Sequence, residues 1–187
     1  MTEEIQMALD EAKGQMDQAI SHLASELAKI RAGKATPSML DSVFVDYYGS
    51  QTPLSQVANV NTLDARTITV QPWEKSLLDE IGRGITNANL GLNPQNNGEL
   101  IIINVPVLTE ERRKDLVKRS KAEGEHAKVS IRNQRKEAMD FIKGLKDDGL
   151  SEDIAKRGED EVQKIVDNYS KKVDALIEAK EADIMTV

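Results

Sequence analysis

The longest periodic patterns of apolar residues predict three amphipathic helices at the two ends of the chain. In residues 2–30, apolar side chains recur every three or four positions, as one face of a helix requires. Residues 109–146 and the segment after Ser151 show the same spacing, and Thr109 and Ser151 are suitable N-terminal caps. Each helix has a single apolar face, so we expect a three-helix bundle that buries all three faces together.

The segment between the first two helices has a different character. Three short runs bounded by Gly, Pro and Asn are rich in β-branched and aromatic residues and predict strands: SVFVDYY, TITVQ and ELIIINV. Between them, EKSLLDEIGRGITNANLG predicts one helix that ends at Gly91. Gly82 and Gly84 lie inside this helical pattern, which indicates close packing rather than a phosphate-binding loop.

The α/β segment must be an insertion, because the bundle is assembled from both ends of the chain. We predict an α+β fold with an elongated, discontinuous three-helix bundle, residues 1–30 and 107–187, and an inserted β/α/β domain, residues 31–106. The chain crosses between them at residues 31–34 and 105–107, and two short tethers restrict their motion to a hinge. The predicted hinge residues are Arg31, Gly33, Lys34, Val105 and Pro106.

The distribution of charge changes the functional picture. A net charge of −7 argues against a general nucleic-acid binder, but residues 109–146 hold 12 basic and 7 acidic side chains. With about 100° per residue, nine of the basic side chains fall on one flank of this helix, between about +40° and +140° from Ile131. We call this set the basic flank: Lys114, Lys118, Lys121, Lys128, Arg132, Arg135, Lys136, Lys143 and Lys146.

The basic flank has more than one interpretation. A solvated helical face would be stabilised by ion pairs such as Glu125 with Lys121 or Lys128. The segregation of charge instead favours a linear contact with a phosphate backbone, and charge alone leaves nucleic acid and an acidic protein equally open as partners. If the partner is a nucleic acid, the candidate binding residues are Arg132, Arg135, Lys128, Lys121 and Lys136.

Few other residues suggest chemistry. Aromatic residues make up 3% of the chain, Cys is absent, and the two His lack a matching pattern of partners. No phosphate-binding or dinucleotide motif is present, so we expect no catalytic residue, no metal site, no cofactor and no enzyme activity. The longest apolar run is Leu100 to Ile103 and the N-terminus is acidic, which predicts a cytoplasmic protein without a leader or membrane contact.

Five stretches resemble the bacterial ribosome recycling factor family in order and spacing. They are KIRAGKATPSMLD (29–41), YYGSQTPLSQVANV (47–60), NLGLNP (89–94), VPVLTEERRKDLVK (105–118) and VSIRNQRKEAMD (129–140). The resemblance implies an L-shaped, transfer-RNA-like outline and binding to large-subunit ribosomal RNA in the post-termination ribosome. It also implies that the protein separates the subunits together with elongation factor G, which hydrolyses the GTP.

The resemblance assigns the ribosomal RNA contact to Arg132 and Arg135. Many family members have Arg at the position of Lys128, where Lys keeps the charge but loses the bidentate fork. The family hinge corresponds to the two crossings of the chain, and we expect a monomer. The alternative is a helical adaptor or chaperone-like module that binds protein through its apolar seam and acidic ends, without binding ribosomes.

Overall fold

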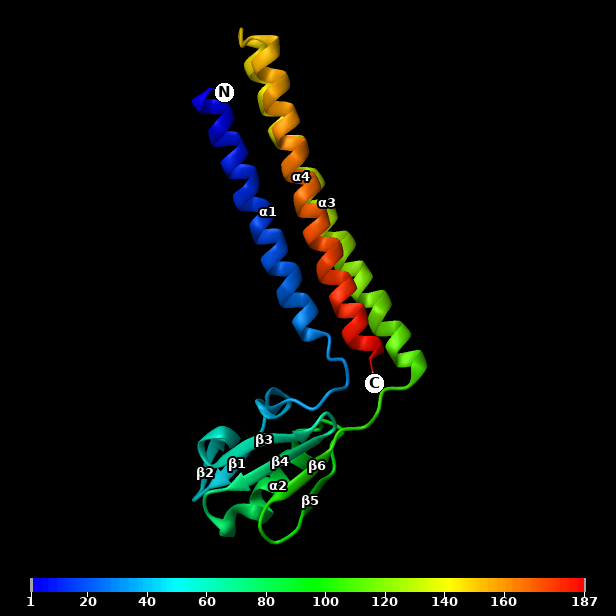
Figure 1. Cartoon of the computed structure of the whole chain (residues 1–187). Helices are drawn as coiled ribbons and strands as arrows, with labels where there is room; N and C mark the ends of the chain where they lie inside the picture. The colour runs from blue at the N-terminus through cyan, green and yellow to red at the C-terminus, as the bar shows by residue number, and fades with distance from the viewer. Residues whose placement is uncertain (1, 187) are drawn as a thin grey trace. The chain divides into compact units, whose positions relative to one another are not determined.

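A computed structural model describes residues 2–186, so residues 1 and 187 of the predicted bundle domain lie outside the described residues. The chain divides into two compact units (Figure 1). One unit runs up to Ala32 and resumes at Glu110, and the other is Gly33–Thr109. Within the described residues, no helix is long and apolar enough to cross a membrane.

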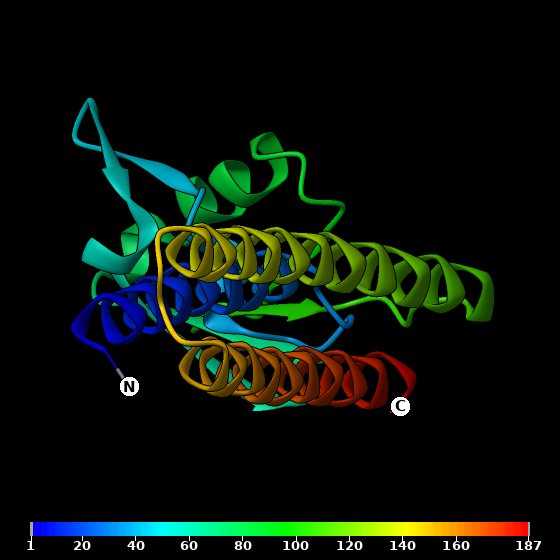
Figure 2. The ribbon, with the colours of Figure 1, turned by 90° about the horizontal axis from the view of Figure 1, so that it is seen from above.

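The first unit is a bundle of three long helices that all pack against one another (Figures 1 and 2). They are α1 (Glu3–Lys29), α3 (Glu110–Asp147) and α4 (Glu152–Met185). The backbone N–H of Ile154 donates to the side chain of Ser151 at 3.4 Å, so the predicted cap of α4 is confirmed. The start of α1 and the turn between α3 and α4 lie at the same end of the bundle (Figure 1).

The apolar faces predicted from the sequence form the core of the bundle. Ile5 and Met16 of α1, Ile131 and Ile142 of α3, and Val173 of α4 are at most 1% exposed. The main correction concerns a residue at the edge of the predicted face of α3, about −80° from Ile131. The helical spacing in residues 109–146 predicts that Phe141 is buried, but its side chain is 47% exposed because the neighbouring helices do not cover that edge.

Small residues on α3 allow close approach of α4. Ser120 and Ala127 are buried, and a Cβ on Gly124 would lie 2.8 Å from Cγ1 of Ile177. This small-residue patch is therefore part of the interface between α3 and α4. It places the side chains of α3 that flank the patch directly beside α4.

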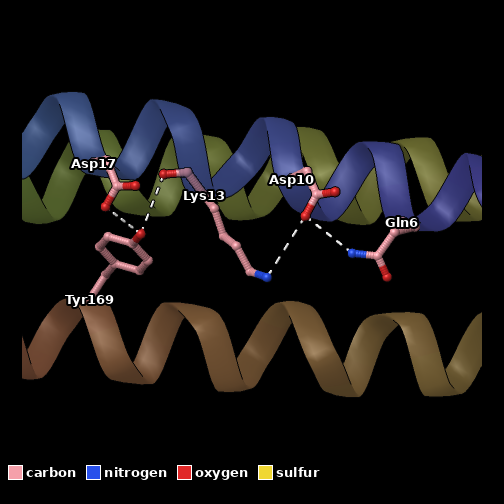
Figure 3. Close-up of polar contacts among 5 residues, drawn as sticks. All are labelled: Gln6, Asp10, Lys13, Asp17 and Tyr169. Atoms are coloured by element: carbon pink, nitrogen blue, oxygen red, sulfur yellow. Dashed lines mark hydrogen bonds and ion pairs between the residues drawn. The ribbon is translucent and has the colours of Figure 1, made fainter.

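A buried tyrosine joins α4 to α1 (Figure 3). The hydroxyl of Tyr169 donates to Oδ1 of Asp17 at 2.5 Å, and Oδ1 of Asp10 accepts from Gln6 and lies 3.8 Å from Nζ of Lys13. Burial and the Asp17 carboxylate raise the pKa of Tyr169 to about 12. The proton of this tyrosine is therefore held more tightly in the folded bundle than in an unfolded chain.

The second unit contains a four-stranded antiparallel sheet in the order β3-β4-β6-β5 and a separate hairpin of β1 and β2. The predicted strands appear as β1 (Phe44–Tyr47), β4 (Thr67–Pro72) and β6 (Ile101–Asn104). The strands that the sequence did not predict are β2 (Ser50–Pro53), β3 (Ala58–Asp64) and β5 (Pro94–Asn96).

The helix of this unit is shorter than predicted. It begins with a 3-10 turn, Lys75–Leu77, and α2 (Leu78–Asn87) ends before Gly91, because Asn89 and Gly91 both have positive φ. A Cβ on Gly84 would lie 2.6 Å from the carbonyl oxygen of Phe44 in β1. This close approach confirms that the Gly-Arg-Gly segment serves packing.

Candidate nucleic-acid interface

The basic flank of α3 divides into two rows according to what each side chain contacts. The inner row, at about +40° to +80° from Ile131, contacts α4 and consists of Lys121, Lys128, Arg135 and Lys146. The outer row, at about +100° to +140°, consists of Lys114, Lys118, Arg132, Lys136 and Lys143. The angle of each residue around the axis of α3 therefore separates side chains that contact α4 from side chains that face away from the bundle.

The inner row is partly neutralised by α4. Nζ of Lys128 lies 2.7 Å from Oδ1 of Asp174, and Nζ of Lys121 lies 3.6 Å from Oε1 of Glu181. The side chain of Lys128 is only 30% exposed, whereas that of Lys121 is 63% exposed. At the end of the row, a hydrogen bond from Lys146 to Glu152 raises the pKa of the lysine. Ion pairs at the surface of a protein are weak, so a phosphate can replace the carboxylate, more easily at Lys121 than at the less exposed Lys128.

Arg135 is held in place by a neutral side chain. Its Nε donates to Oε1 of Gln163 at 2.9 Å, and Nε2 of Gln163 donates in turn to Oδ1 of Asp167 at 2.9 Å. This contact uses the Nε side of the guanidinium group. The edge formed by the two terminal nitrogens remains suited to a bidentate contact with phosphate.

The outer row faces solvent. Nη2 of Arg132 lies 3.7 Å from Oε2 of Glu125, and both side chains are 64% exposed. Lys118, Lys136 and Lys143 are exposed and form no ion pair within the described part of the chain. Among the predicted site residues of this row, Lys136 has no competing carboxylate on any described residue, and the carboxylate that competes for Arg132 is itself exposed to solvent.

Glu125 does not form the ion pairs with Lys121 or Lys128 that a solvated helical face would use. Glu125 pairs instead with Arg132, two turns further along the same helix. The two lysines point toward α4, where Glu181 and Asp174 accept them. The sequence contained a signal for this arrangement, because Asp167, Asp174 and Glu181 recur every seven residues on α4.

The two chain crossings are anchored to one turn of the α/β unit. The backbone N–H of Ala35 donates to the carbonyl of Ala65 at 2.8 Å, and that of Val105 donates to the adjacent carbonyl of Arg66 at 2.7 Å. Gly33 has φ +75°, and a Cβ there would lie 2.7 Å from Cγ of Leu108. Of the predicted hinge residues, Val105 is therefore hydrogen-bonded within the sheet unit, while Gly33 lies against Leu108, directly after the second crossing.

The described residues contain no group of three or more His, Asp or Glu side chains arranged to hold a metal ion. The α+β fold, with a basic flank along one helix, is the framework of a protein that binds a partner. A family model described as ribosome recycling factor matches residues 23–185. The chain therefore belongs to the ribosome recycling factor family, whose members are translation factors without enzyme activity.

Individual relatives agree with this assignment. The chain is 60% identical over 185 residues to the ribosome-recycling factor of Christiangramia forsetii, covering 99% of this chain and 100% of that protein. It is 56% identical over 187 residues to that of Flavobacterium johnsoniae, covering 100% of both. A solution structure of ribosome recycling factor matches with a TM-score of 0.71 and 35% identity over 100% of both chains. The predicted fold class and family are confirmed.

A second structural match carries information about assembly. It is a set of models of the T. thermophilus ribosome recycling factor and the E. coli elongation factor G bound to the E. coli post-termination complex. That chain is 43% identical to this one, with a TM-score of 0.59 and 100% coverage of both.

Proposed function

We propose that this protein recycles ribosomes after translation termination. It binds the post-termination ribosome through large-subunit ribosomal RNA and, with elongation factor G and GTP, promotes separation of the subunits. The support is its family, together with the match to a factor placed on a post-termination complex with elongation factor G. The partner factor hydrolyses the GTP, so this chain needs no cofactor of its own. We expect it to act as a monomer in the cytoplasm.

The observation that carries the proposal is the outer row of the basic flank. Arg132 and Lys136 point away from the bundle on an elongated helix, so their charges can follow a phosphate backbone without unfolding. Arg135 adds a guanidinium whose orientation is fixed by Gln163. Lys121 and Lys128 can bind phosphates only by giving up their ion pairs with the α4 carboxylates. Each should therefore contribute less binding free energy than an unpaired lysine.

The test is binding to purified large subunits at several salt concentrations. Replacing Arg132 and Arg135 together by Ala should weaken binding and reduce the slope of log K against log salt by about 1 for each phosphate that the variant no longer neutralises. Arg119→Ala is the matched control, because Arg119 is exposed on α3 but lies outside the basic flank. If the double variant and the control bind equally well at every salt concentration, the basic flank does not contact the RNA.

We also propose that the two compact units are domains joined by a hinge at Arg31–Lys34 and Val105–Val107, with Val105 as the end that is fixed to the α/β unit. RNA binding then resides on the bundle, while elongation factor G turns the other domain during splitting. Gly33 is the position to change, since its φ of +75° and the nearby Leu108 leave no room for a side chain.

Gly33→Val should therefore retain ribosome binding but slow splitting. Gly98→Val is the control, because Gly98 has a similar φ of +90° in an open turn away from the crossings. The fluorescence of Trp73, the single tryptophan, monitors the folding of the α/β unit in both variants. Equal splitting rates for the two variants would show that the conformation at Gly33 has no mechanical role.

A further inference from the structure

A groove of about 350 Å³ lies between α1 and α3, in the half of the bundle that contains the start of α1. Its floor includes Ala12 and Ala138, which are both buried. Two large apolar side chains border it and remain open to solvent, Met7 at 66% and Phe141 at 47% exposure. Exposed large apolar side chains around one groove are typical of a surface that is covered by a partner.

The polar rim of this groove is acidic. Glu4, Glu11 and Glu137 line it, and no Lys or Arg does. Among residues 2–186, none of these three carboxylates forms an ion pair with a basic side chain. An occupant must therefore combine an apolar group for the floor with positive charge for the rim.

The groove lies on the side of α3 away from the basic flank. Glu137 and Phe141 are at about −120° and −80° from Ile131, whereas the basic flank occupies about +40° to +140°. The two surfaces can consequently be occupied at the same time. Three carboxylates repel a phosphate backbone, so the charge of the groove selects against RNA as its occupant.

We propose that this groove binds a protein segment of the ribosome in which an apolar side chain stands between Lys or Arg residues. The inference rests on the proposed function, because it names a second contact in the same complex. The apolar side chain packs on Ala12 and Ala138 between Met7 and Phe141. The flanking cations meet the carboxylates of the rim, which fixes the direction of the segment.

Site-specific photocross-linking on purified post-termination ribosomes tests this arrangement. One protein carries p-benzoylphenylalanine in place of Met7, at the groove, and a second carries it in place of Val129, which is 46% exposed beside the basic flank. We expect the probe at position 7 to react with a ribosomal protein at a segment rich in Lys or Arg. We expect the probe at position 129 to react with ribosomal RNA.

Charge reversal identifies the role of the rim. Glu11→Lys combined with Glu137→Lys should lower the cross-linking yield at position 7 by about tenfold, because like charges then face the basic segment. Asp140→Lys is the matched control, since this exposed acid lies on the same helix outside the groove, and it should leave the yield unchanged. Equal yields in the reversed and control proteins would overturn the assignment of the rim to a basic partner.

Each other outcome at position 7 is also decisive. Cross-links to ribosomal RNA, to a second copy of this chain or to a protein segment without basic residues would overturn the inference. The inference would also be overturned if the probe at position 7 forms no cross-link while the probe at position 129 does. That result would leave the proposed function intact. If neither position reacts and the protein does not sediment with ribosomes, the proposed function fails together with this inference.

Discussion

A single methyl group at Gly158 should reveal how tightly the three helices are packed together. This glycine of α4 is buried, and a Cβ there would lie 3.1 Å from Cγ2 of Ile5 on α1 and 3.2 Å from Cδ1 of Ile142 on α3. Both distances are shorter than ordinary van der Waals contact, and both isoleucines are 0% exposed. Gly158→Ala must therefore displace two side chains in a close-packed core by a few tenths of an ångström.

The expected magnitude combines two opposing effects. Overpacking a close-packed core costs about 1–3 kcal/mol. The greater helix propensity of Ala relative to Gly stabilises the folded helix by about 1 kcal/mol. Gly14→Ala isolates the second effect, because Gly14 lies within α1 and a Cβ there has no neighbour within 4 Å. We expect Gly14→Ala to stabilise the bundle by about 1 kcal/mol and Gly158→Ala to be about 1–3 kcal/mol less stable than Gly14→Ala.

Urea unfolding monitored by circular dichroism at the helical band is the appropriate assay. The helical signal arises mainly from α1, α3 and α4, with 27, 38 and 34 residues, against 10 residues in α2. The fluorescence of Trp73 reports separately on the α/β unit and should be unaffected by either variant. If Gly158→Ala is as stable as Gly14→Ala, the three helices do not close on Gly158 as described.

Three further substitutions test other contacts. Ala127→Leu should overpack the interface of α3 and α4 by about 1–3 kcal/mol and lower the melting temperature, whereas an unchanged melting temperature would show that Ala127 is not enclosed. Gly84→Ala should destabilise the α/β unit, measured by Trp73 fluorescence, because its Cβ would meet the Phe44 carbonyl oxygen at 2.6 Å. Tyr169→Phe should cost about 1 kcal/mol at neutral pH by removing a hydrogen bond. Folding raises the pKa of Tyr169 from its ordinary value of about 10 to about 12. The wild type should therefore lose this stabilisation as the pH rises from about 10 to about 12. Urea unfolding at the two pH values should show the loss in the wild type but not in the variant.

The helices were predictable because their pattern repeats over many turns. Each long helix buries one face, and a period of three to four residues over more than two dozen positions has no other common explanation. The direction of the basic flank followed from the same geometry. The burial of Phe141 was predicted wrongly because the width of a buried face depends on where the neighbouring helices lie. A helical wheel of one helix holds no information about its neighbours.

The missed strands lack an apolar alternation. In β3, only Ala58 is buried and the last four residues are exposed, so its place in the sheet comes from backbone pairing with β4. β5 has three residues, too few to establish any period. Backbone hydrogen bonds do not depend on side-chain type, and a pattern of side chains does not reveal them.

The division of the basic flank into two rows could not be predicted from the sequence of α3 alone. It depends on which side of α3 carries α4, and that is a tertiary feature. The small residues Gly124 and Ala127 set the close approach, and Asp174 and Glu181 then meet the lysines opposite them.

Subunit splitting tests the central claim most directly. Purified post-termination ribosomes are mixed with this protein, elongation factor G and GTP, and the products are separated by sedimentation. We expect the wild-type protein to convert whole ribosomes into free subunits only when all components are present, and the variant lacking Arg132 and Arg135 to convert markedly fewer. Ribosomes that stay whole with the wild-type protein, or that split equally well with the variant, would contradict recycling through the basic flank of α3.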